Sequence, residues 1–434
     1  MLGKRVETAG PIRVGVIGAG KFASMFLTQA TVSPEIHVVG VADINVPKAR
    51  GALQRTGWAA ERYEAATLDE ALAQGTTCVI DNADAVLECP QIEVILEITG
   101  NPIVGTYHAS KAIENGKHVI MVNVEADCML GPLLAKKAEA AGVIYAMAYG
   151  DQPALICEMV DWARTCGFEV TAAGKGTKYL PEYHYSTPDT IWDHWGFTEE
   201  QLATGDYNAQ MFNSFLDGTK SAIEMTAVAN GTGLMPQDEG LFFPPAGADD
   251  LASVYRPKAD GGILTRTGTV EIASSLNRDG SEVFKHIRNG VFVVFKGRTD
   301  YAQHCFAEYG VTIDASGQYG LELNVSIAAA VLRHEPTGCS RYFNGDVMTT
   351  AKKDLSAGDI LDGEGGYTAF GKLAPAALSL QRHALPLGLA HKAKMVRPVA
   401  KGETITWDDV EVDESLLAVQ LRRQLEHEFG PALV

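Results

Sequence analysis

Two carboxylates and a lysine in the middle of the chain have the types and spacing that proton transfer needs. Asp217, Lys220 and Glu224 follow one another at i, i+3 and i+7. The surrounding residues 209–230 carry apolar side chains at helical spacing, so one helix face would present the lysine between two carboxylates. Lys220 could then donate a proton to a carbonyl under reduction or polarise it, while Asp217 orients it or binds a substrate hydroxyl. An exposed helix with an ordinary ion pair is the alternative.

A second basic pair lies upstream of this helix. Residues 168–173 are typical of a strand, and Lys175 and Lys178 follow in the glycine-containing sequence 174–178. Two lysines in such a turn form a plausible site for a carboxylate or phosphate, and a solvated basic loop is the alternative. Asp151 follows a predicted strand end, where it would contact substrate or ribose, or cap the next helix.

The clearest ligand-binding pattern lies near the start of the chain. Residues 12–17 form an apolar, β-branched run that is typical of a strand buried on both faces. A G-x-G-x-x-A frame follows it and leads into a predicted helix over 22–30. Glycines there allow a tight turn and close approach of a pyrophosphate, and the helix N-terminus favours the anion. The pattern predicts a cofactor site at Gly18, Gly20, Lys21, Phe22 and Ala23, with a plain β-α-β unit as the alternative.

Further strand ends supply polar groups to the same edge. Asp43 ends a strand over 36–42, where a ribose-binding carboxylate belongs. Strands over 92–98 and 118–122 lead to two more polar turns. Because ligands of parallel sheets bind outside the carboxyl ends of the strands, we expect these turns to share one crevice. The expected cofactor contacts in them are Thr99, Gly100 and Asn123.

Strands and helices alternate from residue 11 to about 150, which predicts a doubly wound parallel α/β sheet of the Rossmann type. The first ten residues read as a polar lead, residues 81–84 as a loop, and 133–141 as a helix. A mixed α+β region follows, with a strand over 290–296. Beyond about residue 347, the segments 351–360 and 396–405 have similar sequences, which predicts an internal β repeat. The tail over 416–429 reads as a surface helix.

The composition limits the possible partners. A net charge of −18 argues against nucleic acid and anionic membranes as partners. The chain has no run of eighteen apolar residues, so no membrane span is expected. Seven cysteines without a C-x-x-C pair argue against disulfides and structural zinc and favour reduced thiols in the cytoplasm. The lack of an H-E-x-x-H motif or similar cluster predicts no tightly held metal, although Mg²⁺ could accompany a phosphorylated substrate.

Several phrases resemble known proteins. The N-terminal half resembles the homoserine dehydrogenase superfamily in residues 18–23, 97–100 and 116–119. Nearly the whole chain resembles members of one subgroup of this superfamily. These are the deoxyxylulose phosphate reductoisomerase-like (DXR-like) proteins that end in a SAF domain. The repeat is similar to the SAF pattern. The other phrases that carry this resemblance are Val122–Asp127, Ala172–Gly176, Phe215–Lys220 and Glu224–Asn230.

The resemblance implies a Rossmann domain over 11–153, a catalytic and dimerisation domain over 154–345 and a SAF-like domain over 346–434, usually in a homodimer. Asp217 and Lys220 lie where the homoserine dehydrogenases place their catalytic residues, but three positions apart rather than four. The DXR-like members use NADPH. A carboxylate at Asp43 would repel a 2′-phosphate, so we expect NAD(H) to be favoured over NADP(H).

These observations predict a cytoplasmic NAD(P)-dependent dehydrogenase or reductase, of the EC 1.1.1 class, that acts on a small polar hydroxy or keto compound. Phosphorylated and unphosphorylated compounds are both candidate substrates. Enzyme alternatives are a deoxyxylulose phosphate reductoisomerase and a homoserine dehydrogenase, and the alternative outside catalysis is a protein that senses a cofactor or sugar. The expected catalytic residues are Lys220, Asp217 and Lys175, and the expected substrate contacts are Glu125, Asp151, Lys178, Glu224 and Asn230.

Overall fold

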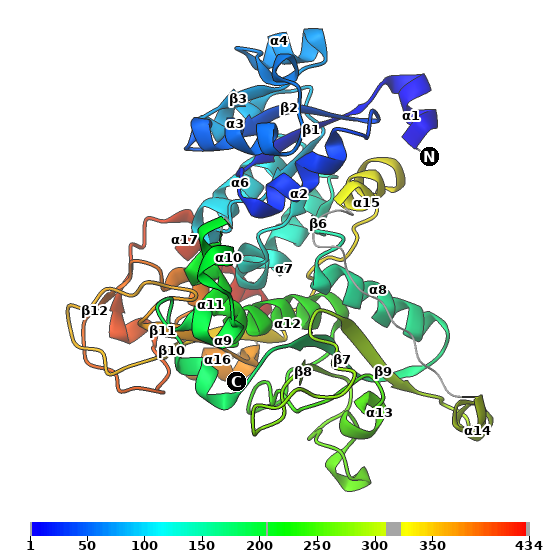
Figure 1. The fold of residues 1–434 in the computed structure, drawn as a ribbon, viewed down its shortest axis with the longest axis vertical. Coiled ribbons are helices and arrows are strands. Elements are labelled where there is room, and N and C mark those ends of the chain that lie inside the picture. Colours follow the sequence, from blue (N-terminus) through cyan, green and yellow to red (C-terminus); the bar gives the residue numbers. More distant parts are fainter. Residues whose placement is uncertain (1, 205–206, 310–322, 431–434) are drawn as a thin grey trace. The chain divides into compact units, whose positions relative to one another are not determined.

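The computed structural model describes residues 2–204, 207–309 and 323–430, which divide into two compact units (Figure 1). Unit 1 comprises residues 2–154 and 323–339. Unit 2 comprises residues 155–309 and 340–430. The predicted further boundary near residue 346 stays a prediction.

Unit 1 is built on a six-stranded parallel sheet in the order β3-β2-β1-β4-β5-β6. The chain moves outward from β1 to β3 and then returns to the other side of β1, so the strand order reverses between β1 and β4. The predicted Rossmann-type α/β fold is therefore confirmed. The strands are β1 Ile12–Ile17, β2 Ile36–Ala42, β3 Cys78–Ile80, β4 Val94–Glu97, β5 His118–Met121 and β6 Tyr145–Met147.

Helices connect these strands, and three of them differ from the sequence-based expectation. The expected polar lead contains helix α1, and the expected loop after β3 contains α5, which Asn82 caps by accepting a hydrogen bond from Ala85 N. Helix α7 begins directly after Asn123 rather than near residue 133, because the Asn123 side chain caps it. The helices are α1 Leu2–Ala9, α2 Lys21–Ala30, α3 Val46–Arg55, α4 Leu68–Gln74, α5 Ala83–Glu88, α6 Pro102–Glu114 and α7 Val124–Ala140.

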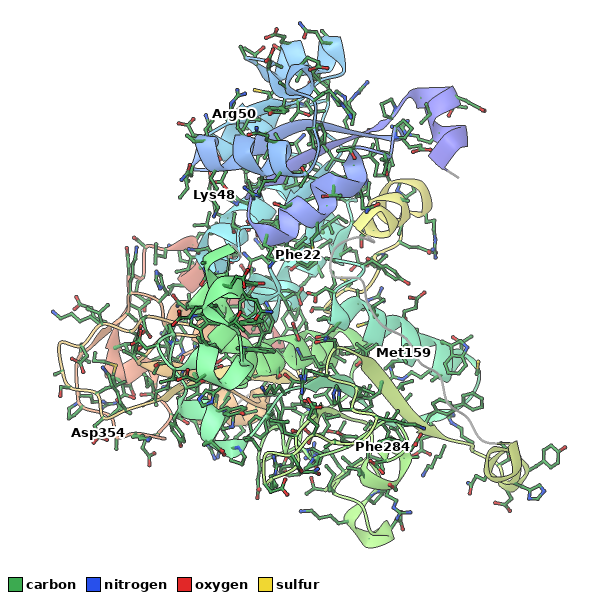
Figure 2. All side chains as sticks on the ribbon, viewed as in Figure 1. Phe22, Lys48, Arg50, Met159, Phe284 and Asp354 are labelled. Atoms are coloured by element: carbon green, nitrogen blue, oxygen red, sulfur yellow. The ribbon has the colours of Figure 1, made fainter. Side chains whose placement is uncertain are left out.

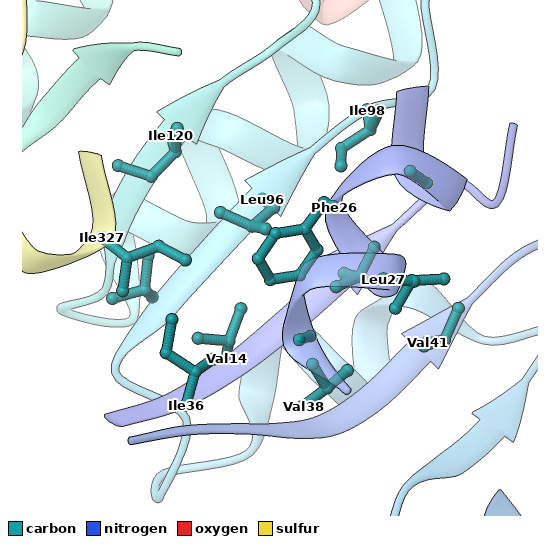
Figure 3. Close-up of a cluster of buried hydrophobic side chains, with 14 of the residues drawn as sticks. Val14, Phe26, Leu27, Ile36, Val38, Val41, Leu96, Ile98, Ile120 and Ile327 are labelled. Carbon is teal, nitrogen blue, oxygen red and sulfur yellow. The ribbon is translucent and has the colours of Figure 1, made fainter. Parts of the chain in front are cut away.

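The core of unit 1 lies between the sheet and its helices (Figure 3). Phe26 and Leu27 of α2 are almost fully buried against Val14 of β1 and Leu96 of β4. Burying each such side chain contributes about 1.5–3 kcal/mol. A later segment joins the same core, since Ile327 of α15 (Leu323–Ala328) is fully buried there. The spacing of apolar residues along β1 and α2 thus fixes where the glycine turn between them lies.

Unit 2 is organised around a buried helix, α12 (Thr219–Thr232), whose residues 221–230 are all buried. It packs against a three-stranded sheet in the order β8-β7-β9 and against the hairpin β10-β11. Other elements of this unit are α8 Gln152–Thr165, β7 Glu169–Thr177, α9 Ile191–Trp195, α10 Glu199–Thr204, α11 Ala209–Leu216, α13 Leu251–Val254, β8 Thr269–Ser274, β9 Val291–Lys296 and α14 Asp300–Tyr309.

Two predictions for unit 2 are wrong. The expected single helix over 209–230 is broken between α11 and α12, where Gly218 adopts a left-handed conformation with φ 84°. The expected turn over 174–178 is mostly part of β7. A Cβ at Gly174 or Gly176 would lie 1.7 Å from a backbone oxygen of a neighbouring segment. These glycines therefore allow close approach of two chains rather than a turn.

The predicted internal repeat is confirmed by its hydrogen bonds. Leu355 and Val399, which are equivalent in the two phrases, exchange both backbone hydrogen bonds, at 2.8 and 3.0 Å. Gly358 N donates to Met395 O, and the equivalent Gly402 N donates to Ala351 O. Both glycines have positive φ, 96° and 85°. The two copies therefore pair with each other in a two-fold arrangement.

The last segment consists of β10 Gly345–Ala351, β11 Ala369–Pro375, α16 Ala376–Gln381, β12 Lys394–Met395, β13 Val410–Glu411 and α17 Leu417–Phe429. Helix α17 confirms the predicted helical tail, but it is not simply a surface helix. Arg422 is fully buried and its guanidinium forms two hydrogen bonds with Asp346 of β10, at 2.9 and 2.6 Å. This pair fastens the end of the chain to unit 2.

Candidate functional site

The glycine turn of unit 1 fits a pyrophosphate. Gly18 has φ 98°, and a Cβ there would lie 2.8 Å from Ile98 O, so only glycine fits. Gly20 is the N-cap of α2 and supplies no side chain to cap it, and a Cβ at this position would meet no atom within 4 Å. The side of Gly20 on which a Cβ would lie is thus open, as the close approach of an anion to the backbone at a helix N-terminus requires. Ala23 is fully buried one turn later and allows the helix to lie close to β1.

Asp43 is tied to this turn. Its Oδ2 accepts a hydrogen bond from Ala19 N at 2.7 Å, and its Oδ1 accepts one from Asn45 N at 2.8 Å. The carboxylate is partly exposed, and the next residue, Ile44, is 97% exposed. Asp43 therefore fixes the shape of the glycine turn and still presents acceptor lone pairs at the end of β2.

Two basic side chains lie in the first two turns of the following helix, α3 (Figure 2). The Arg50 guanidinium donates to Tyr63 O at 3.1 Å and lies 6.0 Å from the centroid of the Tyr63 ring. Lys48 is exposed near the start of the helix. Arg50 is thus engaged by its own unit, which leaves Lys48 as the accessible cation of the first turns of α3.

The turns after β4 and β5 are joined by side chains. Asn123 Nδ2 donates to Asn101 O at 2.9 Å and to Thr99 Oγ1 at 3.3 Å. Gly100, between them, has φ 67°. The structure therefore brings together Thr99, Gly100 and Asn123. Glu125 is nearby in sequence but is buried in the first turn of α7.

Asp151 lies at the beginning of α8, and its Oδ1 accepts a hydrogen bond from Gln152 N at 2.9 Å. The ligand contact and the helix cap expected for Asp151 both stay predictions, and its side chain is partly exposed.

Within unit 2, Lys175 of β7 and Glu224 of α12 form an ion pair through Lys175 Nζ and Glu224 Oε2. Both side chains are almost fully buried, with 5% and 4% exposure. Lys220 lies one helical turn before Glu224 on α12 and is partly buried. The sequence did not predict this pair, because its two residues are far apart in the chain and Lys175 was expected in a turn rather than in a strand. The structure thus places Glu224 at the centre of a buried acid–base pair, with a second lysine on the same helix face.

Asp217 belongs to a different part of the unit. It ends α11 and is fully buried, with Oδ1 accepting from Thr219 N at 2.9 Å. Its Oδ2 accepts from Lys352 Nζ at 2.7 Å. The break at Gly218 therefore takes Asp217 off the face that carries Lys220. Asp217 fixes the start of α12.

Lys352 is a residue that sequence reasoning missed. Its ammonium group also donates to Ser186 O at 3.0 Å and to Gly366 O at 2.8 Å. One signal could have revealed it. Lys352 occupies the position in the first copy of the repeat at which the second copy has Val396. A lysine that replaces an apolar residue in a repeat indicates a special contact.

Lys178 and Asn230 also have structural partners. Lys178 Nζ donates to His194 O, and burial lowers the pKa of this lysine. Asn230 Oδ1 accepts hydrogen bonds from Asn344 N and Gly345 N at 3.0 and 3.2 Å, which fixes the chain that enters β10. None of these hydrogen bonds involves Lys175 or Glu224.

Glu271 of β8 is a second residue that sequence reasoning missed. It is fully buried and accepts hydrogen bonds from Phe242 N, Ile272 N and Gln237 Nε2. Burial raises the pKa of Glu271 to about 7, and these hydrogen bonds oppose the shift. Its carboxyl group holds the segment 237–243 against the sheet.

In the described parts of the chain, no group of three or more histidine, cysteine, aspartate or glutamate side chains is arranged to hold a metal ion. No helix among the described residues has the length and apolar character needed to span a membrane.

Two family models match the chain. Residues 12–121 match the oxidoreductase family with an NAD-binding Rossmann fold. Residues 150–322 match the catalytic domain of oxidoreductase DRL. The first match covers the glycine turn, Asp43 and Thr99. The second covers Lys175, Lys220 and Glu224 and ends before Lys352.

Parts of the chain are also similar to individual proteins. A homoserine dehydrogenase from Methylobacillus glycogenes is 31% identical over 144 residues, which cover 30% of this chain and 30% of that protein. The chain therefore spans less than a third of that relative. A homoserine dehydrogenase structure from Thiobacillus denitrificans is 21% identical, with 54% of this chain and 51% of that chain covered and a TM-score of 0.37. A 3-ketoreductase structure from Actinomadura kijaniata is 18% identical, with 39% and 49% covered and a TM-score of 0.27.

The fold and the two family matches support an oxidoreductase with an NAD-binding Rossmann domain, and each family model matches less than half of the chain.

Proposed function

We propose that this protein is a nicotinamide-dependent dehydrogenase or reductase, of the EC 1.1.1 class, that exchanges a hydride with a small polar hydroxy or keto compound. One observation carries the proposal. A buried ion pair, Lys175–Glu224, lies one helical turn from Lys220 within the region similar to an oxidoreductase catalytic domain. Reduction of a carbonyl needs a proton donor at its oxygen, and lysine beside a carboxylate can supply one.

The residues have distinct roles in this proposal. The cofactor supplies the hydride when it is bound. Lys220 donates a proton to the substrate oxygen or polarises it, and Glu224 holds the two lysines in place by charge. Lys175 forms the ion pair that fixes the Glu224 carboxylate one helical turn from Lys220, and Lys220 regains its proton from solvent. Asp217 acts through the start of α12 rather than on the substrate, because both of its oxygens are occupied.

We further propose that NAD(H) binds more tightly than NADP(H). The Asp43 carboxylate lies at the end of β2, where the adenosine ribose of a dinucleotide is bound. It can accept hydrogen bonds from ribose hydroxyls and would repel a 2′-phosphate. Arg50, which could neutralise such a phosphate, is held by Tyr63. Lys48 is then the residue that would favour NADP(H) once the carboxylate is removed.

The proposal leaves the substrate to experiment. Homoserine and a deoxyxylulose phosphate are both candidates, the first because of the match to a homoserine dehydrogenase. A phosphorylated substrate would bring Mg²⁺ as its partner rather than a protein-held metal. A homodimer, a SAF-like C-terminal domain and a cytoplasmic location complete the proposal. A sensor of sugar or cofactor would bind the dinucleotide without turning over any substrate.

The test is a substrate panel read at 340 nm. Purified protein is mixed with NADH, NAD⁺, NADPH or NADP⁺ and with C4–C6 keto acids, hydroxy acids, sugars and sugar phosphates. With the substrate found, Lys220→Met should lower turnover by about 10²–10⁴-fold without changing the NADH dissociation constant. Lys296→Met is the matched control, because Lys296 is 51% exposed in a surface ion pair with Glu169. Turnover by Lys220→Met at the rate of the control would contradict the proposed role.

A further inference from the structure

The carboxyl group of Glu97, the last residue of β4, is fully buried within unit 1. Its Oε1 accepts a hydrogen bond from Thr99 Oγ1 at 2.6 Å and lies 3.1 Å from His108 Nδ1 of α6. Its Oε2 has no hydrogen-bond partner among the residues that the structure describes. A buried carboxylate with one unpaired oxygen is costly. An apolar side chain would suit a purely structural strand end better, so the acid calls for an explanation in terms of function.

Glu97 begins a chain of oriented hydrogen bonds. Thr99 gives its only hydroxyl proton to Glu97, so its lone pairs accept from Asn123 Nδ2 and from Asn101 N, both at 3.3 Å. Asn123 Nδ2 also donates to Asn101 O, while its Oδ1 caps α7. Both ends of the Asn123 amide are therefore fixed. The contacts from His108 through Glu97 and Thr99 to Asn123 tie the end of β4 to the end of β5.

The network has little room to rearrange. Helix α6 passes so close to it that Gly105 has no space for a side chain. A Cβ at Gly105 would lie 2.4 Å from Asn123 Nδ2 and 3.0 Å from Glu97 Oε2. The backbone of α6 thus closes one side of the network, and the buried His108 closes another.

The strand order locates this network relative to a bound dinucleotide. A Rossmann sheet consists of two halves that each bind one nucleotide, and the ligand crosses the point where the strand order reverses. Here that point lies between β1 and β4. Asp43 marks the adenosine half at the end of β2, so the other half, over the ends of β4 and β5, takes the nicotinamide nucleotide.

We propose that the buried Glu97–His108 pair is a positioning unit for the turns at Thr99–Gly100 and Asn123, and that it gives these turns their affinity for the nicotinamide half of the cofactor. Neither residue touches the cofactor. The inference rests on the proposed function only in that the Rossmann domain binds a nicotinamide dinucleotide.

Two ligands separate a positioning role from a structural one. NADH contains both halves of the cofactor, whereas ADP-ribose has the adenosine, the pyrophosphate and a ribose but no nicotinamide. In the full chain, Glu97→Leu removes the acceptor of Thr99 at similar volume. It should lower the affinity for NADH by about tenfold or more and the affinity for ADP-ribose by about twofold or less, as measured by calorimetry. Glu97→Gln keeps an acceptor for Thr99 and should retain NADH affinity within about threefold.

Lys117→Met is the matched control, since Lys117 is buried at the opposite end of the same strands. Its Nζ donates to Ile92 O at 2.9 Å and to Cys89 O at 2.5 Å, before β4 begins. This variant should lower the unfolding temperature and leave the ratio of the two affinities unchanged.

The inference would be overturned if Glu97→Leu lowered the affinities for both ligands equally, or if it left the NADH affinity unchanged. If Glu97→Leu does not fold, Gly105→Ala is the second variant, because its Cβ displaces Asn123 while Glu97 and His108 are retained. The same selective loss of NADH affinity is expected. Failure of wild-type protein to bind ADP-ribose would overturn the proposed cofactor function itself, and this inference with it.

Discussion

The two buried lysine–carboxylate pairs of unit 2 look alike but differ in how completely they are satisfied. The Lys352 ammonium has three acceptors, and both oxygens of Asp217 accept hydrogen bonds. Among the described residues, Lys175 Nζ has one acceptor, Glu224. A saturated pair can only hold structure. A pair with donors to spare can bind a ligand or move a proton. On this difference we propose a positioning role for Lys352–Asp217 and a chemical role for Lys175–Glu224.

The largest effect should come from the unsaturated pair. Lys175→Met should lower kcat by about 10²–10⁴-fold, because the Glu224 carboxylate loses its ion-pair partner and no longer holds Lys220 in place for proton donation. NADH affinity, measured by fluorescence titration, should not change. A variant that retains more than half of wild-type turnover would show that this pair is only structural.

The saturated pair should govern stability instead. Lys352→Met leaves Asp217 as an uncompensated buried charge and should lower the free energy of unfolding by about 3–5 kcal/mol, measured by urea denaturation. The double variant Lys352→Met/Asp217→Leu removes both charges and should recover most of this loss. If the double variant is as unstable as the single one, the pair does more than fix the start of α12.

A third experiment extends the comparison to unit 1, where both oxygens of Asp43 accept backbone hydrogen bonds but the carboxylate is partly exposed. Asp43→Ser removes the charge that repels a 2′-phosphate. It should lower the affinity for NADH by about tenfold and raise the affinity for NADPH relative to that for NADH. Asp43→Asn, which keeps an acceptor for Ala19 N, separates the effect of charge from the effect on the turn. Tighter NADPH than NADH binding in wild-type protein would contradict the proposed preference.

The smallest effect concerns Glu271, whose carboxyl is satisfied by hydrogen bonds yet has a raised pKa of about 7. Because the folded state then binds a proton more tightly than the unfolded state, this group favours folding at low pH. Its contribution should be lost as the pH rises from about 4.5 to 7. Glu271→Gln should flatten this part of the stability profile in thermal unfolding between pH 5 and 8. An unchanged slope would show that Glu271 is already ionised at pH 5.

The sequence predicted unit 1 well for a physical reason. Parallel strands buried on both faces leave continuous apolar runs, and the turns between them carry glycine or a polar cap. Residues 12–17 and 36–42 were thus found with their exact bounds. Helix α5 was missed because it is short and begins at Asn82, a residue equally typical of a loop.

Unit 2 was harder to predict because its glycines have roles that local patterns do not distinguish. Gly174 and Gly176 allow close contact inside a strand, whereas Gly218 breaks a helix. Both kinds of glycine interrupt an otherwise regular pattern. The Lys352–Asp217 pair joins residues 135 positions apart, and no local periodicity reports such a contact. The asymmetry of the repeat, Lys352 against Val396, is the signal that could have revealed it.

The central claim is tested most directly by the turnover of two variants under conditions where both are folded. With the substrate found by the panel, hydride transfer at 340 nm is measured for Lys175→Met and for Lys352→Met/Asp217→Leu. We predict that the first is destabilised by the unpaired Glu224 carboxylate but still folded, and nearly inactive. The second should retain turnover within about tenfold of wild type. An active Lys175→Met beside an inactive double variant would reverse the two roles and contradict the account.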